Sequence, residues 1–325
     1  QLQMAEDECE AANRLAASAP YVIFLAVKAV LCYVAIVLLV WHLKRNSVRW
    51  LVHNNTKIVF SACLGCNFAA SAAFGSIYTI DTLRLWLGGP CPLLDFRIVF
   101  LLRGTGIIAL MSQILCALVL SLERLYSSLF PVQFEKGQCV TLSVVAVILS
   151  LLVATSVMVF FLVPLADWKT LVPTTNLKQR ETADGYQTMI YIMIGMELAA
   201  IVTFHVGWLV NYCRRPDLST TASIALLYQI KENAEILSTL LPIEYLHSAF
   251  MCTITFGMAL YPHIVPVEAQ SDVNQQIFLE VLSMPAHFTL FLVVILEYKL
   301  ARRRRRLRHT VISNEAERYF QNLQK

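Results

Sequence analysis

The sequence predicts an all-α membrane protein, a seven-transmembrane helix bundle with the N-terminus outside the cell and the C-terminus in the cytoplasm. Hydrophobic residues make up 57% of the 325 positions and charged residues only 15%, and the mean hydropathy is +0.61. This composition is too apolar for an ordinary soluble domain. Two further observations support the prediction: the number of long apolar stretches, and the distribution of Lys and Arg between them.

A helix needs about 20 mostly apolar residues to cross the hydrocarbon core of a bilayer, because lipid offers no partners for backbone groups. Seven stretches meet this requirement: Pro20 to Leu43, Lys57 to Ile80, Leu93 to Tyr126, Cys139 to Leu165, Thr188 to Tyr212, Ile236 to Tyr261, and Gln275 to Lys299. The first stretch is expected to act as its own insertion signal. No internal repeat is present, so residues 20–299 are expected to form one bundle.

Lys and Arg set the orientation, because cytoplasmic connections carry an excess of both. The connections that begin after the first stretch, together with the tail, hold eighteen Lys and Arg, and the opposite set holds five. Four acidic residues also lie between Glu6 and Glu10. We therefore expect residues 1–19 outside the cell and a basic tail, residues 300–325, in the cytoplasm.

The third stretch holds a polar stripe that should face the interior of the bundle. Steps of three and four from Arg103 reach Gly106, Gln113 and Arg124, which share one helical face. Glu123 precedes Arg124 at the cytoplasmic end, so an ion pair that breaks when a partner protein takes the Arg is one interpretation. An Arg that only extends to the lipid headgroups is the other.

Four short motifs resemble those of known receptor families. The run Glu123-Arg124-Leu125-Tyr126 is similar to the Asp/Glu-Arg-Tyr signature of rhodopsin-like receptors, with Leu125 at the position of its Tyr. The runs from His53 to Lys57 and from Tyr228 to Asn233, with Glu317 to Phe320 in the tail, resemble the nematode serpentine chemoreceptors of the Sra superfamily, which includes Sra and Srab. The resemblance covers nearly the whole chain.

This resemblance implies a chemosensory G-protein-coupled receptor in the plasma membrane of sensory cilia. It implies that a small external chemical is the ligand and that a heterotrimeric G protein is the partner. At the inner face we expect a G-protein switch, for which the candidate residues are Glu123, Arg124, Tyr126, Lys231, Glu232 and Asn233. A helix-six displacement would move the last three most, although a solvated helix end would explain them equally well.

Charged residues inside the predicted helices are costly and usually face the interior or a watery cavity. Lys28, Arg97 and Arg103 balance Glu197, Glu244 and Glu280 in number, so mutual pairing is one interpretation. The other is a ligand cavity in the outer half of the bundle. The candidate ligand-binding residues are Arg97, Arg103, Tyr78, Trp86, Glu197, Tyr191, Tyr245, Glu280 and His287.

Most of the nine Cys lie in apolar runs, where a thiol behaves as a small hydrophobic group, and no metal site or cofactor is predicted. Cys9 and Cys91 are the two Cys expected outside the membrane. We predict a disulfide between them, since outer surfaces are oxidising; two unpaired thiols are the alternative. A retinal Schiff base is not expected, because no Lys lies between Gln275 and Tyr298.

The basic run from Arg302 to Arg308 is explained by the orientation alone, and attraction to anionic lipids is an added expectation. Beyond it, Ile312, Ala316, Phe320 and Leu323 recur at helical spacing and predict a short amphipathic helix on the membrane. Nothing predicts nucleic-acid binding. A transporter or channel is the rival interpretation, and an enzyme is disfavoured because no nucleophile and base pair or phosphate loop is evident.

Overall fold

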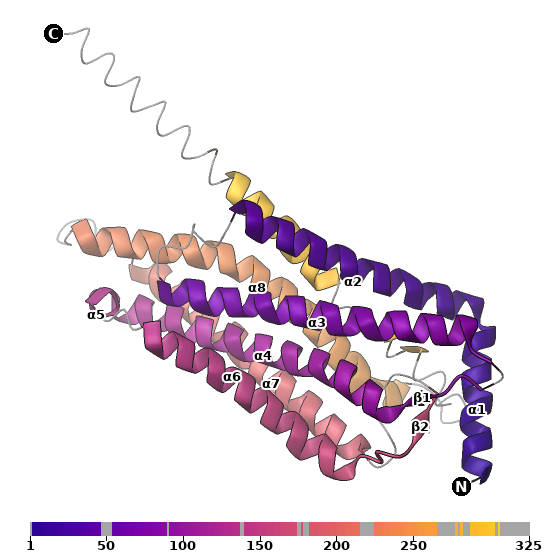
Figure 1. Ribbon diagram of the computed structural model, residues 1–325. Coiled ribbons are helices and arrows are strands. Elements are labelled where there is room, and N and C mark those ends of the chain that lie inside the picture. The colour runs from indigo at the N-terminus through magenta and orange to yellow at the C-terminus, as the bar shows by residue number, and fades with distance from the viewer. Residues whose placement is uncertain are drawn as a thin grey trace, which may run out of the picture.

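The computed structural model describes residues 2–46, 54–89, 91–136, 140–173, 177, 182–214, 224–264, 277–278, 280–281, 287–302 and 305. The described chain is a bundle of long helices with one short helix, α1, across one end (Figure 1). The helices are α1 (Leu2–Ala17), α2 (Ala19–Asn46), α3 (Asn54–Leu87), α4 (Phe96–Leu129), α5 (Pro131–Lys136), α6 (Val140–Leu162), the 3-10 turn η2 (Val163–Leu165), α7 (Ala183–Arg214) and α8 (Ile224–Ile264). Residues 277–278, 280–281 and 287–302 are also helical.

Each predicted apolar stretch coincides with helical residues, so the seven-helix prediction is confirmed. Five described helices are long and apolar enough to cross a membrane by length and composition: α2, α3, α4, α6 and α7. α8 and residues 287–302 occupy the sixth and seventh predicted stretches. The helices exceed the predicted stretches at most ends, as α3 does by starting at Asn54 and ending at Leu87, because a helix continues where water replaces lipid.

α4 lies at the centre of the bundle and contacts α3, α6, α7 and α8. Its most apolar stretch is 61% buried, against 17% in α6, whose outer surface is left for lipid. α3 and α4 approach closely at Gly106, where an added Cβ would lie 2.8 Å from the ring of Phe74. Small residues at helix contacts allow this kind of packing within membranes.

The buried apolar side chains form two clusters at different depths. One cluster lies toward α1, at the end of the bundle that is called outer below, and includes Leu15, Phe74 and Met251. The inner cluster includes Leu39 of α2 and Leu296 of the C-terminal helical residues. His42 of α2 also lies 2.8 Å from Glu297 through Nδ1 and Oε1, which joins the first and last spans at the inner end.

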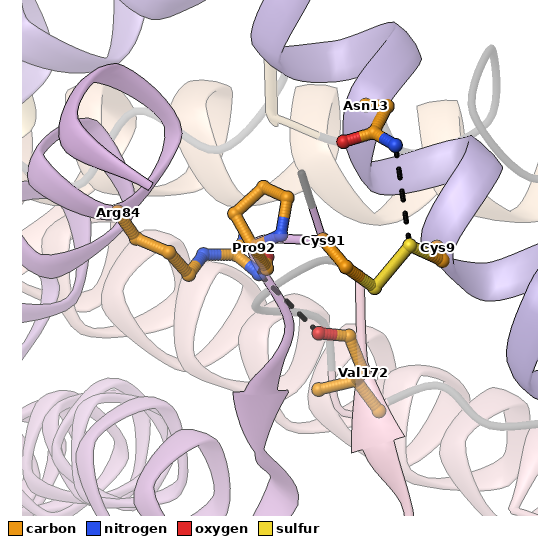
Figure 2. Close-up of a disulfide and its surroundings, with 6 residues drawn as sticks. All are labelled: Cys9, Asn13, Arg84, Cys91, Pro92 and Val172. Carbon is orange, nitrogen blue, oxygen red and sulfur yellow. Dashed lines mark hydrogen bonds between the residues drawn. A yellow bond between two sulfur atoms is a disulfide. The ribbon is translucent and has the colours of Figure 1, made fainter. Parts of the chain in front are cut away.

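α1 and a short two-stranded sheet cover the outer end of the bundle. β1 (Leu94–Asp95) pairs antiparallel with β2 (Leu171–Val172). The structure joins Cys9 of α1 to Cys91, with 5.1 Å between their Cα atoms, and so confirms the predicted disulfide (Figure 2). The helix in residues 1–19 was not predicted, because this segment is too polar to resemble a membrane-spanning helix.

Arg84 anchors this outer cover to α3. Its guanidinium donates to the carbonyl oxygens of Pro92 at 2.5 Å and Val172 at 3.3 Å (Figure 2). It also donates to the Pro173 carbonyl oxygen at 2.9 Å and to Asp81 Oδ1 at 2.7 Å. One side chain therefore ties the segment that carries Cys91 to β2. The predicted amphipathic helix of the tail lies outside the described residues.

Candidate functional site

The outer half of the bundle contains a buried charge cluster centred on Glu280. Lys28 Nζ of α2 lies 3.1 Å from Glu280 Oε2 and donates to the Glu280 carbonyl oxygen at 2.5 Å. Arg103 Nη1 of α4 binds Glu280 Oε1. Relative exposure is 4% for Lys28, 4% for Arg103 and 3% for Glu280. Two cations share one carboxylate, so the three side chains carry one excess positive charge.

Aromatic rings enclose both cations of this cluster. Lys28 Nζ lies 4.3 Å from the centre of the Tyr78 ring, and Arg103 Cζ lies 5.7 Å from the centre of the Phe74 ring. A cation over an aromatic face is stabilised by about 0.5–2 kcal/mol. The rings therefore hold the cations in place within a region that water does not solvate.

Arg103 also lines a small cavity between α3, α4, α7 and α8. The cavity has about 50 Å³ of space for the centre of a water molecule. Its other lining residues are mainly apolar and include three methionines: Phe74, Ile107, Leu110, Tyr186, Met189, Ile190, Met193, Met251, Ile254 and Thr255. Met side chains adapt to irregular shapes, so the walls can adjust to a bound molecule.

The structure brings together some of the predicted ligand-binding residues and separates the rest. Tyr78, Arg103 and Glu280 meet in the charge cluster, and His287 is half-buried on the C-terminal helical residues. Arg97 is exposed and donates from Nε to the Trp168 carbonyl oxygen at 3.3 Å, away from the charge cluster.

The other predicted ligand-binding residues do not face this cavity. Trp86 is 75% exposed and borders a separate hollow between α1, α2 and α3. Tyr191 is 55% exposed, and its hydroxyl accepts from Gln187 Nε2 at 2.9 Å. Tyr245 is 49% exposed and contacts His205. Glu197 is buried, but it lies beside His247 rather than Arg103.

A second polar network surrounds Arg124 at the inner end. Arg124 is 1% exposed, and its Nη2 lies 2.5 Å from Glu123 Oε1 and 2.7 Å from Thr56 Oγ1. Thr56 Oγ1 donates to the same Glu123 oxygen at 2.7 Å. The Arg124 guanidinium also lies 5.3 Å from the centre of the Phe134 ring. Arg124 therefore points into the protein and not toward lipid headgroups.

Asn233 of α8 connects this network to α7. Its Oδ1 accepts from Arg124 Nη1 at 3.3 Å and from Ser127 Oγ at 3.0 Å. Its Nδ2 donates to Ser128 Oγ at 2.7 Å and to Asn211 Oδ1 at 3.3 Å. Asn211 Nδ2 donates to Ser128 Oγ at 2.5 Å. One buried amide thus ties α4, α7 and α8 together.

The remaining switch candidates lie outside this network or outside the described side chains. Tyr126 is 48% exposed, and its ring is tilted against that of Phe130, with 5.4 Å between the ring centres. Lys231 and Glu232 belong to α8, but their side chains are not among those described. Four members of the network were not predicted from the sequence: Thr56, Ser127, Ser128 and Asn211. The signal that could have identified them is that they are polar residues within apolar helices.

Electrostatics also shape the outer surface, at the turn that follows η2. Hydrogen bonds from the Thr170 hydroxyl and the Lys169 backbone amide hold the pKa of Asp167 below its ordinary value. Burial, followed by repulsion from Asp167, raises the pKa of Glu8 on α1. Protonation of Glu8 therefore favours the folded state, whereas protonation of Asp167 disfavours it, although the two carboxylates share one surface.

Comparison with protein families agrees with the seven helices. The family described as "Serpentine type 7TM GPCR receptor class ab chemoreceptor" matches residues 6–325 of the chain. A comparison with curated proteins finds no match. The family match covers all seven spans and most of the N-terminal helix. The chain therefore belongs to the serpentine class ab chemoreceptors, which are seven-transmembrane G-protein-coupled receptors and not a class of enzymes.

Proposed function

We propose that this receptor detects a small external molecule that carries an anionic or hydrogen-bond-accepting group on an apolar body. The excess positive charge around Glu280 is the observation that carries the proposal. Lys28 and Arg103 share one carboxylate, and Arg103 also faces the cavity. A ligand acceptor group near Arg103 would complete the coordination of a buried cation, which is costly to leave under-compensated.

The rest of the cavity matches the apolar part of such a ligand. Ile107, Ile190 and three Met side chains form its walls, and Thr255 and Tyr186 contribute hydroxyl groups. Ligand cavities of this kind combine an apolar lining with a few polar groups that fix orientation. The small volume favours a compact molecule of the kind a chemosensory receptor meets.

The inner network is the proposed point of contact with a heterotrimeric G protein. Arg124 is held by Glu123, Thr56 and Asn233, which lie on three different helices. A shift of α8 would break the Asn233 bonds and leave Arg124 available to a partner. Ligand binding in the outer cavity would favour that state through α7 and α8, which line it and also carry Asn211 and Asn233.

The same proposal places the N-terminus outside the plasma membrane of a sensory cilium. The Cys9 to Cys91 disulfide supports this orientation, because disulfides persist on oxidising surfaces. Arg302 and Arg305 are exposed near the opposite end of the chain from α1. They begin the basic tail, residues 300–325, for which anionic lipids of the inner leaflet are the proposed partners.

A reporter assay with a matched pair of variants tests the proposed function. Cells that express the chain with a G-protein reporter would be screened with small carboxylates, esters and ketones, and with hydrocarbons of the same size. We expect responses to acceptor-bearing compounds only. Arg103→Gln should reduce potency by at least about tenfold, the effect of losing one charged hydrogen bond, whereas Arg97→Gln on the same helix should leave it unchanged.

Two results would contradict the proposal. Equal potency of wild type and Arg103→Gln, at equal surface expression, would place the ligand elsewhere. A ligand-evoked current that persists without any G protein would instead favour the channel interpretation.

A further inference from the structure

A second buried cluster of ionisable side chains lies between α7 and α8, away from Arg103 and Arg124. It consists of Glu197 on α7 and of Glu244 and His247, which lie three residues apart on α8. Each side chain offers a ligand atom, and these atoms lie within 4.8 Å of one another. Relative exposure is 1% for Glu197, 7% for Glu244 and 3% for His247.

The hydrogen bonds of this cluster leave several strong acceptors without a partner. His247 Nδ1 lies 2.8 Å from Glu197 Oε1, and Ser248 Oγ donates to the same oxygen at 2.5 Å. Within the described part of the chain, Glu197 Oε2, Glu244 Oε1 and His247 Nε2 are buried without a hydrogen-bond partner. A buried polar atom that lacks a partner costs about 1–3 kcal/mol, so three such atoms on neighbouring side chains indicate that something else completes the site.

The charge of the cluster indicates the chemical nature of the missing component. Among the ion pairs of the described residues, Lys28 and Arg103 belong to Glu280, and Arg124 belongs to Glu123. The basic partner described for Glu197 is His247 alone. Two buried carboxylates beside one imidazole require a compensating positive charge, because ions inside a membrane protein are otherwise costly.

A small cavity, lined mostly by apolar side chains, adjoins the cluster and has room for water. Glu244 and His247 line it together with Asn67 and Gln113, and it has about 40 Å³ of space for the centre of a water molecule. A cavity needs roughly 10–15 Å³ by this measure to hold one water. Gln113 Oε1 is also buried and, within the described part of the chain, has no hydrogen-bond partner.

We propose that Glu197, Glu244 and His247 bind a divalent transition-metal cation of the zinc class. Two carboxylate oxygens and one imidazole nitrogen are ligands that zinc accepts, and a water from the adjoining cavity would supply a fourth position. Two carboxylates balance a charge of +2. Mg²⁺ and Ca²⁺ fit less well, because they require about six oxygen ligands.

The contact between His247 and Glu197 places two of the proposed ligand atoms side by side. His247 Nδ1 and Glu197 Oε1 lie 2.8 Å apart. Two ligands of one tetrahedral ion lie roughly 3 Å apart, because zinc–nitrogen and zinc–oxygen bonds are each about 2.0–2.2 Å long. A cation held by Glu197 on α7 and by two residues on α8 would bridge the helices that line the outer cavity.

Binding to the purified full-length chain in lipid nanodiscs tests this site without reference to signalling. We expect Zn²⁺ to raise Tm by on the order of 5 °C at about 100 times its Kd, and Mg²⁺ to have no such effect. Co²⁺ should give the visible absorption of a tetrahedral complex. Glu244→Gln, which keeps the size of the side chain, and His247→Ala should weaken binding by at least about tenfold.

His205→Ala is the matched control, because it removes another histidine from the contact between α7 and α8. His205 contacts Tyr245 and lies outside the cluster. It should bind Zn²⁺ as the wild type does. Absence of Zn²⁺ and Co²⁺ binding would overturn the proposal and leave protons as the compensating charge. Equal binding by wild type, Glu244→Gln and His247→Ala would overturn it as well, by placing the metal elsewhere.

Discussion

The polar networks at the two ends of the bundle use different chemistry. At the outer end, Lys28, Arg103 and Glu280 are all formally charged, and they contact one another through ion pairs. At the inner end, a single ion pair, Arg124 with Glu123, is surrounded by hydroxyl and amide side chains. Both networks are buried, so solvent exposure does not explain the contrast.

This difference indicates which end can change its contacts at lower cost. Breaking a buried ion pair leaves a bare charge, which destabilises a protein by about 3–5 kcal/mol. Exchanging one neutral hydrogen bond for another costs far less, about 0.5–1.5 kcal/mol for a bond that is lost. The inner network is therefore suited to rearrangement, whereas the outer cluster is suited to holding a fixed charge against a ligand.

The largest predicted effect comes from removing the shared carboxylate at the outer end. Glu280→Ala should destabilise the receptor by about 3–5 kcal/mol, because it leaves Lys28 and Arg103 buried without a counter-ion. The measurement is Tm and the folded yield of the purified protein. Asp184→Ala, at an exposed position in the first turn of α7, is the control and should change Tm far less. Equal Tm values for the two variants would remove the contrast between the ends.

The next effect concerns the disulfide over the outer cluster. Cys9→Ser and Cys91→Ser should each destabilise the chain by about 2–4 kcal/mol, because the bond closes a loop with a sequence separation of 82 residues. The double variant should lose no more than either single variant, since both remove one bond. Additive losses in thermal unfolding would show that the thiols act separately.

A smaller loss of stability is predicted at the inner end, with a larger change in signalling. Asn233→Ala removes bonds to Arg124, Ser127, Ser128 and Asn211. We expect a loss of about 1–2 kcal/mol and a rise of roughly tenfold in basal G-protein activation, because 1.4 kcal/mol shifts a two-state equilibrium by that factor. Ser238→Ala, at an exposed position of α8, is the control. Unchanged basal activity in Asn233→Ala would argue against a resting lock.

The smallest effect is a pH dependence on the outer surface. The pKa of Glu8 is raised, so its contribution to stability is complete below the ordinary value of 4.5 and is lost as the pH rises through the folded value. Glu8→Gln should therefore raise Tm slightly at neutral pH and leave it unchanged below 4.5. Asp167→Asn should instead lower Tm slightly at neutral pH, because a carboxyl group with a lowered pKa stabilises the fold at pH values above its ordinary pKa. Parallel pH profiles of the two variants would contradict this assignment.

The membrane spans could be predicted from the amino-acid sequence alone. Each helix in lipid must satisfy its own backbone hydrogen bonds, so each span can be recognised without its neighbours. The family could be inferred in the same way, since the runs around Glu123 and Asn233 are contiguous motifs. The disulfide was also predictable, because Cys9 and Cys91 were the two Cys in segments expected on the outer side of the membrane. These features depend on local composition or on the predicted topology.

Which charged side chains form ion pairs could be read only from the packed structure. Glu280 could have paired with Arg97 as well as with Arg103, and Glu197 gave no sign that it would lie beside Glu244 and His247. Helix rotation and tilt settle these contacts, and they result from the packing of every neighbouring helix at once. A side chain one step around a helix is exposed instead of facing the interior, as Tyr191 and Trp86 are. Packing of that kind is not encoded in any one stretch of sequence.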